Sequence, residues 1–158
     1  MRLLLVLLIA SLTACGFQPR RELVLPANLQ ALRVETPDPY SALQRGLEQA
    51  LQRAGARVDG EARSGVLRIS RAELNQRPLS IGATGRVQEF ELTYAVDAEL
   101  IDAQGNALLP KQTVELSRDY SFDTAQALGS PGEEELLRSE LERDMIAAVL
   151  RRVDAALR

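Results

Sequence analysis

Apolar and polar residues alternate along four segments of the chain, at the period of two that is typical of a strand with one buried face. These segments are 31–36, 66–74, 86–101 and 108–122. A turn-forming sequence, 102–106, separates the last two segments, and we expect residues 77–85, which include Pro78, to connect the second and third as a hairpin. The pattern therefore predicts four strands.

Two other segments repeat apolar residues every three or four positions, the period of a helix with one buried face. The first helix is expected to start at Asp38-Pro39, a candidate N-cap and first helical position, and to end at Gly55, which suits a left-handed C-terminal position. The second follows a candidate capping box at 130–133 and continues to the C-terminus. The apolar positions are Leu43, Leu47, Ala50, Leu51 and Ala54 in the first helix and Leu137, Leu141, Met145, Ile146, Val149, Val153 and Leu157 in the second.

The order of these elements, β-α-β-β-β-α, predicts the fold class. A helix between two strands favours a right-handed crossover with the strands parallel, whereas short turns join antiparallel strands. We expect an α+β two-layer sandwich, with two helices packed on one face of a four-stranded mixed sheet. Phe90 on the third strand and Leu141 on the last helix are expected in its core.

The N-terminal residues have the pattern of an export signal, because Met1-Arg2 is followed by an apolar run over 3–12 and then by small residues. The run is too short to span a bilayer, which takes about 20 residues. Leu12-Thr13-Ala14-Cys15 resembles the bacterial lipobox, whose cysteine carries an N-acyl diacylglycerol lipid and becomes the mature N-terminus. The predicted divisions are a lipoprotein signal peptide over 1–14, an acylated N-terminus and tether over 15–28, and a single domain over 29–158.

Composition removes several classes of function. The 158 residues include no histidine and one cysteine, Cys15, which excludes histidine-based catalysis and zinc sites built from cysteine and histidine. We expect no cofactor and no metal. The net charge of −3 becomes −4 when cleavage removes Arg2, which argues against electrostatic binding of nucleic acid. One enzyme class stays open, a hydrolase with paired carboxylates such as Glu89 and Glu91, which share a face of a regular strand.

Four features of the chain together resemble one bacterial family. Gly16-Phe17 directly follows the lipobox, and the element order is β-α-β-β-β-α. The stretch Gly85-Arg86-Val87-Gln88-Glu89-Phe90-Glu91-Leu92 is similar to a Gly-x-x-x-Glu-aromatic strand opening, and a second similarity runs from Arg118-Asp119-Tyr120 through 125–128 to Glu142-Arg143-Asp144-Met145. In this combination the chain resembles the LPS-assembly lipoprotein family, LptE.

The resemblance implies a non-enzymatic lipoprotein that faces the periplasm, occupies the lumen of the outer-membrane β-barrel LptD and helps to deliver lipopolysaccharide (LPS) to the outer leaflet. Sorting to the outer membrane is expected because position 16 holds Gly16 instead of the aspartate that retains such lipoproteins in the inner membrane. The alternative is an auxiliary lipoprotein of an ABC-type lipid-transport system. The protein that co-purifies with the chain distinguishes the two.

The resemblance also implies LPS contacts through basic residues near the loop between the second and third strands and before the last helix. This chain has no basic residue at 82–84 or 123–132. We therefore predict Arg77 and Arg86, which flank the hairpin, and Lys111 on the next strand as LPS contacts, because such cations pair with phosphate. The alternative is that each is a solvated charge at a strand end.

Overall fold

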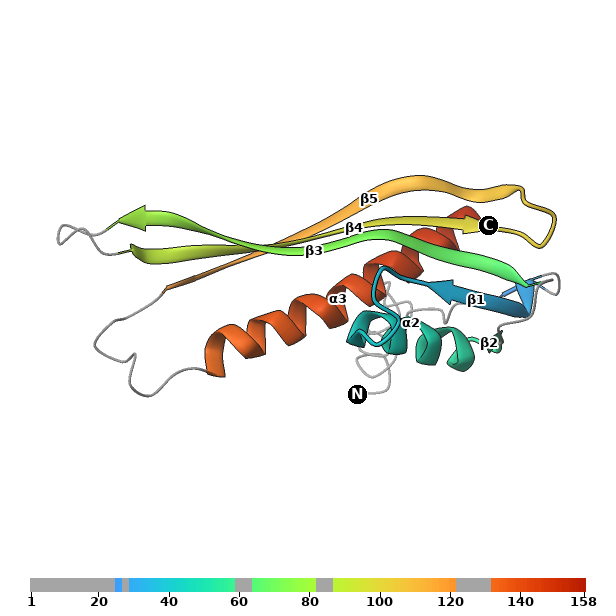
Figure 1. Cartoon of the computed structure of the whole chain (residues 1–158), viewed down its shortest axis with the longest axis horizontal. Coiled ribbons are helices and arrows are strands. Elements are labelled where there is room, and N and C mark those ends of the chain that lie inside the picture. The colour runs from blue at the N-terminus through green and yellow to red at the C-terminus, as the bar shows by residue number, and fades with distance from the viewer. Residues whose placement is uncertain (1–24, 27–28, 59–63, 82–86, 122–131) are drawn as a thin grey trace, which may run out of the picture.

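The computed structural model describes residues 25–26, 29–58, 64–81, 87–121 and 132–158. The elements in these ranges are β1 (Ala31–Glu35), α2 (Ala42–Arg53), β2 (Arg57–Val58), β3 (Gly65–Ile81), β4 (Val87–Ile101), β5 (Ala107–Ser121) and α3 (Gly132–Ala156) (Figure 1). Cys15, Arg86 and the start of the predicted capping box, Ser130-Pro131, fall outside the described residues. Both predicted helices and all four predicted strands are present.

The strands of the described chain form one sheet in the order β2-β1-β3-β4-β5. β1 is parallel to both of its neighbours, whereas β3, β4 and β5 are antiparallel. The parallel pairing of β1 with β3 confirms the parallel pairing predicted around α2. The prediction of four strands missed β2, because this strand has two residues and a segment that short shows no periodicity.

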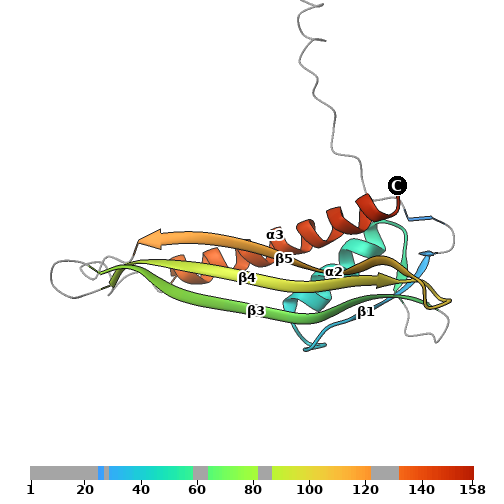
Figure 2. The same cartoon turned by 90° about the horizontal axis from the view of Figure 1, so that it is seen from above.

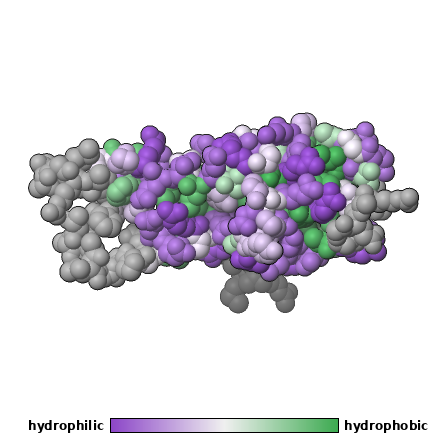
Figure 3. Space-filling view, viewed as in Figure 1, coloured by the Kyte–Doolittle hydropathy of each residue, from purple (hydrophilic) through white to green (hydrophobic). Residues whose placement is uncertain are grey.

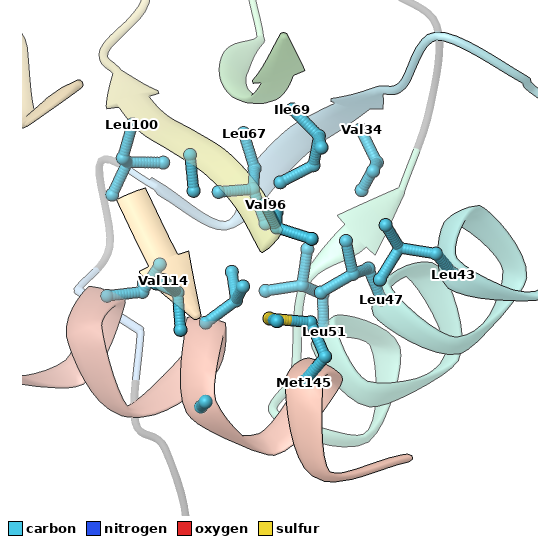
Figure 4. Close-up of a cluster of buried hydrophobic side chains, with 14 of the residues drawn as sticks. Val34, Leu43, Leu47, Leu51, Leu67, Ile69, Val96, Leu100, Val114 and Met145 are labelled. Atoms are coloured by element: carbon cyan, nitrogen blue, oxygen red, sulfur yellow. The ribbon is translucent and has the colours of Figure 1, made fainter. Parts of the chain in front are cut away.

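Both helices cover the same face of the sheet, as predicted for a two-layer α+β sandwich (Figure 1). Apolar side chains from α2, α3 and the facing side of the strands fill the space between the layers (Figure 4). The fully buried ones include Leu43, Leu47 and Leu51 of α2, Leu67, Leu92, Val96 and Leu100 of the sheet, and Leu141 and Met145 of α3. Leu141 thus lies in the core as predicted, whereas Phe90 is partly buried and packs at the margin of the core.

The residues at the two ends of α2 show how the helix starts and stops. Ser41, and not the predicted Asp38, is the N-cap, because its hydroxyl accepts a hydrogen bond from the Gln44 N–H at 3.1 Å. Asp38 instead closes a turn before the helix and accepts from the Tyr40 N–H at 2.9 Å. Aspartate and serine both cap helices well, so local sequence does not choose between them. Gly55 has φ 89°, which confirms the predicted left-handed glycine after the helix.

β3 is longer than predicted and continues to Ile81. Residues 77–81, expected in the connection, pair with β4 instead, and Pro78 lies opposite Phe90. Proline is tolerated there for two reasons. β1 pairs with β3 only as far as Arg68, which leaves the other edge of β3 without a strand in this region of the described chain, and the register is irregular just after Pro78.

The molecule is elongated, with two distinct ends (Figure 2). The turn end holds the turn 102–106, the starts of β1 and β3 and the last turns of both helices, and the hairpin end holds the junction of β3 with β4 and the first turn of α3. The predicted turn over 102–106 is confirmed, and Gly105 within it has φ 89°. The 15 residues of β4 connect the two ends over about 50 Å.

Candidate functional site

The face of the sheet that points away from the helices carries many charged residues. Strand alternation turns the neighbours of the buried residues to this side. We call it the charged face, and its members include Arg33, Glu35, Arg68, Arg71, Arg77, Glu91, Asp97, Glu99 and Lys111. Each of these has an opposite charge within 4.0 Å. In Figure 3, hydrophilic residues cover most of the described surface in view, and hydrophobic residues form separate patches.

Near the turn end, Arg68 of β3 bridges two carboxylates from the neighbouring strands. Its Nε lies 2.9 Å from Glu35 Oε2 on β1, and its Nη1 lies 2.9 Å from Glu99 Oε1 on β4. Arg33 Nη2 is a second cation, 2.8 Å from Glu35. The hydrogen bond from Arg68 is the main reason that the pKa of Glu35 is lowered, so this carboxylate stays ionised at lower pH than a free glutamate.

Asp97 on β4 is the least exposed acid among the ion pairs of the charged face, with 13% of its side chain exposed. Arg71 contacts both carboxylate oxygens, at 3.1 Å through Nε and 2.9 Å through Nη2, and the Thr113 hydroxyl donates at 2.7 Å. These hydrogen bonds, Arg71 first, lower the pKa of Asp97 to about 2. Lys111 Nζ lies 3.7 Å from the same carboxylate, so Asp97 links β3, β4 and β5.

A β-bulge places Arg71 on the charged face. Ile69 lies opposite Ala98 and Arg71 lies opposite Asp97, which leaves Ser70 as an extra residue of β3. Without the bulge, strict alternation from the buried Ile69 would turn Arg71 toward the helices. The ion pair with Asp97 therefore depends on this irregularity in β3.

Toward the hairpin end, Arg77 pairs with Glu91, which lies directly opposite on β4. The hydrogen bond from Arg77 is the main reason that the pKa of Glu91 is lowered, and the Thr93 hydroxyl at 3.3 Å contributes in the same direction. The acid of a paired-carboxylate hydrolase needs a raised pKa. The surroundings of Glu91 therefore do not favour the hydrolase hypothesis.

The structure does not bring the predicted LPS contacts Arg77 and Lys111 together. Their partners, Glu91 and Asp97, lie six residues apart on β4, about 20 Å. Both cations remain accessible, with 68% of the Arg77 side chain and 56% of the Lys111 side chain exposed. Arg86, the third predicted contact, lies outside the described residues.

A second polar group, which the sequence did not reveal, joins the sheet to α3 near the hairpin end. The Tyr120 hydroxyl of β5 accepts from Gln76 Nε2 of β3 at 2.6 Å and donates to Glu134 of α3 at 3.2 Å. Arg138, one turn along the helix, holds Glu134 at 2.7 Å. The Tyr120 ring stacks on Phe90 with centroids 5.6 Å apart. We call this group the Tyr120 network. One indication of it was present in the sequence, because the alternation along the strand placed Tyr120 on the same face as the apolar residues.

The sequence model of the family described as "LptE: Lipopolysaccharide-assembly" matches residues 29–153. The chain belongs to the LptE family. Two relatives carry the name LPS-assembly lipoprotein LptE. The one from Photorhabdus laumondii is 28% identical, and its alignment covers 96% of this chain and 83% of the relative. The one from Yersinia enterocolitica is 33% identical, and its alignment covers 94% of this chain and 72% of the relative. The resemblance noted in the sequence is confirmed.

Solved structures share the fold of this LptE-family chain. The solution structure of an uncharacterized lipoprotein B from Nitrosomonas europaea has 32% sequence identity and a TM-score of 0.74, covering 89% of this chain and 91% of that one. The crystal structure of the rare lipoprotein B from Shewanella oneidensis has 28% sequence identity and a TM-score of 0.69, covering 79% of this chain and 94% of that one. Within the described ranges, none of the helices has the length and apolar character needed to cross a membrane.

Proposed function

We propose that this chain is a non-enzymatic lipoprotein of LPS assembly, held in the outer membrane by acyl chains on Cys15 and facing the periplasm. Its protein partner is the β-barrel LptD, whose lumen it occupies, and its cargo is LPS on the way to the outer leaflet. The observation that carries the proposal is the family match over residues 29–153, which spans nearly the whole domain. Relatives named LPS-assembly lipoprotein align with almost the entire chain.

The charged face supports a position inside a barrel with a polar lumen. Charges that are covered by an apolar surface lose their hydration at a high energetic cost, whereas a polar wall and trapped water leave them hydrogen-bonded. The ion pairs of Arg68 with Glu99 and of Arg71 with Asp97 neutralise much of the charge within the sheet itself. The face therefore offers hydrogen-bonding groups without a strong field of one sign.

Arg77, Arg86 and Lys111 remain our proposed LPS contacts, and the first and last act at two separate places on the sheet. Lys111 can turn to a phosphate with little loss, because Arg71 and Thr113 still hold Asp97. Arg77 has to leave or share Glu91, whose other hydrogen-bond donor in the described chain is a hydroxyl. We therefore expect Lys111 to be the more readily available cation and Arg77 to need a stronger phosphate contact.

Co-purification tests the proposed partner. The full-length chain, tagged at its C-terminus and expressed in a Gram-negative host, is purified in detergent and its bound proteins are identified by mass spectrometry. Recovery of LptD is the expected result. Recovery of an inner-membrane ABC transporter without LptD would support the auxiliary alternative and overturn the proposal. The N-terminal peptide from the same preparation should start at a lipid-modified Cys15, and the matched Cys15→Ser variant should accumulate as the unprocessed precursor.

A further inference from the structure

Within the described residues, the turn end of the molecule gathers arginines that have no carboxylate partner. Among the arginines that the structure describes, eight lie within 4.0 Å of a described carboxylate and five do not. Four of these five are at the turn end, and all four are exposed. We call them the turn-end arginines: Arg53 at the end of α2, Arg57 at the start of β2, and Arg151 and Arg152 in the last turns of α3.

Two described acids at this end, Asp102 in the turn and Asp154 in α3, are engaged in local contacts. Asp102 accepts hydrogen bonds from the Gln104 N–H at 2.9 Å and from the Asn106 N–H at 2.8 Å within its own turn. Asp154 pairs with Arg158 at 2.6 Å. The C-terminal carboxylate is a further negative group at this end. The four unpaired arginines therefore leave the described part of the turn end with an excess of positive charge, although the whole chain carries −3.

The path of the chain brings the tether to the same end. Leu29 lies beside Gly65 at the start of β3, so the N-terminal segment joins the domain at the turn end. Residues 15–24 can span at most roughly 35 Å when fully extended. The hairpin end lies about 50 Å farther along the sheet. An acyl anchor on Cys15 therefore holds the turn end nearest to the membrane.

We propose that the turn-end arginines rest on the anionic phospholipid surface of the membrane that holds the anchor. This inference rests on the acyl anchor of the proposed function. Arg57 is on β2 at one edge of the sheet, and Arg152 reaches Gln112 of β5 at the other, which are roughly 20 Å apart across the strands. That spread is too wide for a single phosphate and matches a surface with many headgroups. The contact fixes the turn end, and not the hairpin end, at that surface.

Vesicle binding of the chain without its anchor tests the proposal. The whole mature chain with Cys15→Ser is mixed with vesicles of phosphatidylcholine, with or without phosphatidylglycerol, and the bound fraction is measured by sedimentation. We expect binding that requires phosphatidylglycerol and falls with salt. Arg151→Gln with Arg152→Gln should lower the partition coefficient about 25-fold, because one arginine near an anionic surface contributes about five-fold. The matched control, Arg45→Gln with Arg143→Gln, removes two exposed helix arginines away from the turn end and should bind like the parent.

Three results would overturn the proposal. The first is equal binding to both kinds of vesicle, and the second is a loss in the control variant as large as in the Arg151 and Arg152 variant. The third comes from a parallel titration with purified LPS. If the Arg151 and Arg152 variant no longer binds LPS but still binds vesicles that contain phosphatidylglycerol, the ligand of the turn end is LPS. Circular dichroism and thermal unfolding of each variant confirm the fold, since cations at a helix C-terminus also stabilise the helix. The vesicle experiment contains no LptD. A negative result therefore overturns the membrane contact without bearing on LptD as the proposed partner.

Discussion

The Tyr120 hydroxyl lies 3.2 Å from the Glu134 carboxylate and donates a hydrogen bond to it, which joins β5 to the first turns of α3. Burial first, and then the nearby charge of Glu134, raise the pKa of Tyr120, so the phenol stays a neutral donor at neutral pH. Farther along the helix, α3 is held by fully buried residues such as Leu141 and Met145. The first turns of α3 therefore depend on polar contacts more than the rest of the helix does.

Tyr120→Phe should loosen the start of α3 and leave the core intact. The new ring can still stack on Phe90, but Glu134 and Gln76 each lose a partner, at a cost of about 1–2 kcal/mol. We expect faster amide hydrogen exchange over 134–138 and unchanged exchange over 148–153, measured by mass spectrometry. Equal acceleration in both segments would contradict a local role for the Tyr120 network.

Leu141→Ala should destabilise the domain by about 2–5 kcal/mol, because it removes a fully buried side chain and leaves a cavity. Phe90→Ala should lower the free energy of unfolding by less than the same truncation of a fully buried phenylalanine, since Phe90 is at the margin of the core. Leu136→Ala is the control on the same helix, and its exposed side chain should contribute about 0.5 kcal/mol or less. Urea denaturation gives the three values. A Leu136 effect equal to that of Leu141 would show that α3 faces the sheet differently.

Gly46→Ala should be most destabilising while Ile146 keeps its full length. A Cβ at position 46 of α2 would overlap Ile146 Cδ1 of α3, so the helices approach closely at this glycine. Overpacking costs about 1–3 kcal/mol and the gain in helix propensity offsets about 1 kcal/mol of it. Ile146→Val removes Cδ1 and keeps Cγ1, which would lie 3.3 Å from the added Cβ, so in its presence Gly46→Ala should be much less destabilising. A double-mutant cycle by urea denaturation measures this coupling, and additive effects would refute the close contact.

Acid should weaken the sheet in part through Asp97. Its pKa in the folded chain is about 2, below the ordinary value of 3.8, so its stabilising effect is complete above about pH 4 and is lost as pH falls through about 2. Asp97→Asn should lower the Tm at neutral pH and show a smaller fall in Tm between pH 4 and pH 2. Part of the fall should remain, because the pKa values of Glu35 and Glu91 are also lowered. A wild-type pH profile in Asp97→Asn would contradict this account.

Arg86→Asp combined with Lys111→Asp should weaken binding of purified LPS by about tenfold or more at fixed ionic strength, because charge-assisted hydrogen bonds to phosphate are lost. Lys111→Asp alone should have a larger effect than Arg77→Asp alone, since Arg77 is held by Glu91. Arg45→Asp with Arg143→Asp makes the same change in charge elsewhere and should bind like wild type. If the double variant binds LPS as tightly as the wild-type chain, the proposed contacts are wrong and the chain acts chiefly as a structural plug.

The local pattern of residues predicted most of the elements. The alternation from Leu92 to Leu100 identified the buried face of β4, and the spacing of Leu141, Met145 and Val149 identified that of α3. Gly55 marked the positive φ angle after α2, and residues 102–106 marked the turn that contains Gly105. These features are readable because the side chains of one strand or helix share a face by local geometry alone. The lipobox and the family resemblance are equally local, since they consist of short runs of residues.

Contacts between distant segments were decided by the tertiary structure. Arg71 and Asp97 meet because Ser70 bulges and because β3 pairs with β4 in one register, which no local period specifies. The same holds for the strand order, for β2, and for the distance between the proposed contacts Arg77 and Lys111. A shift of one residue in strand pairing would turn a whole set of side chains to the other face. The charged residues could be found in the sequence, but their partners depend on that register.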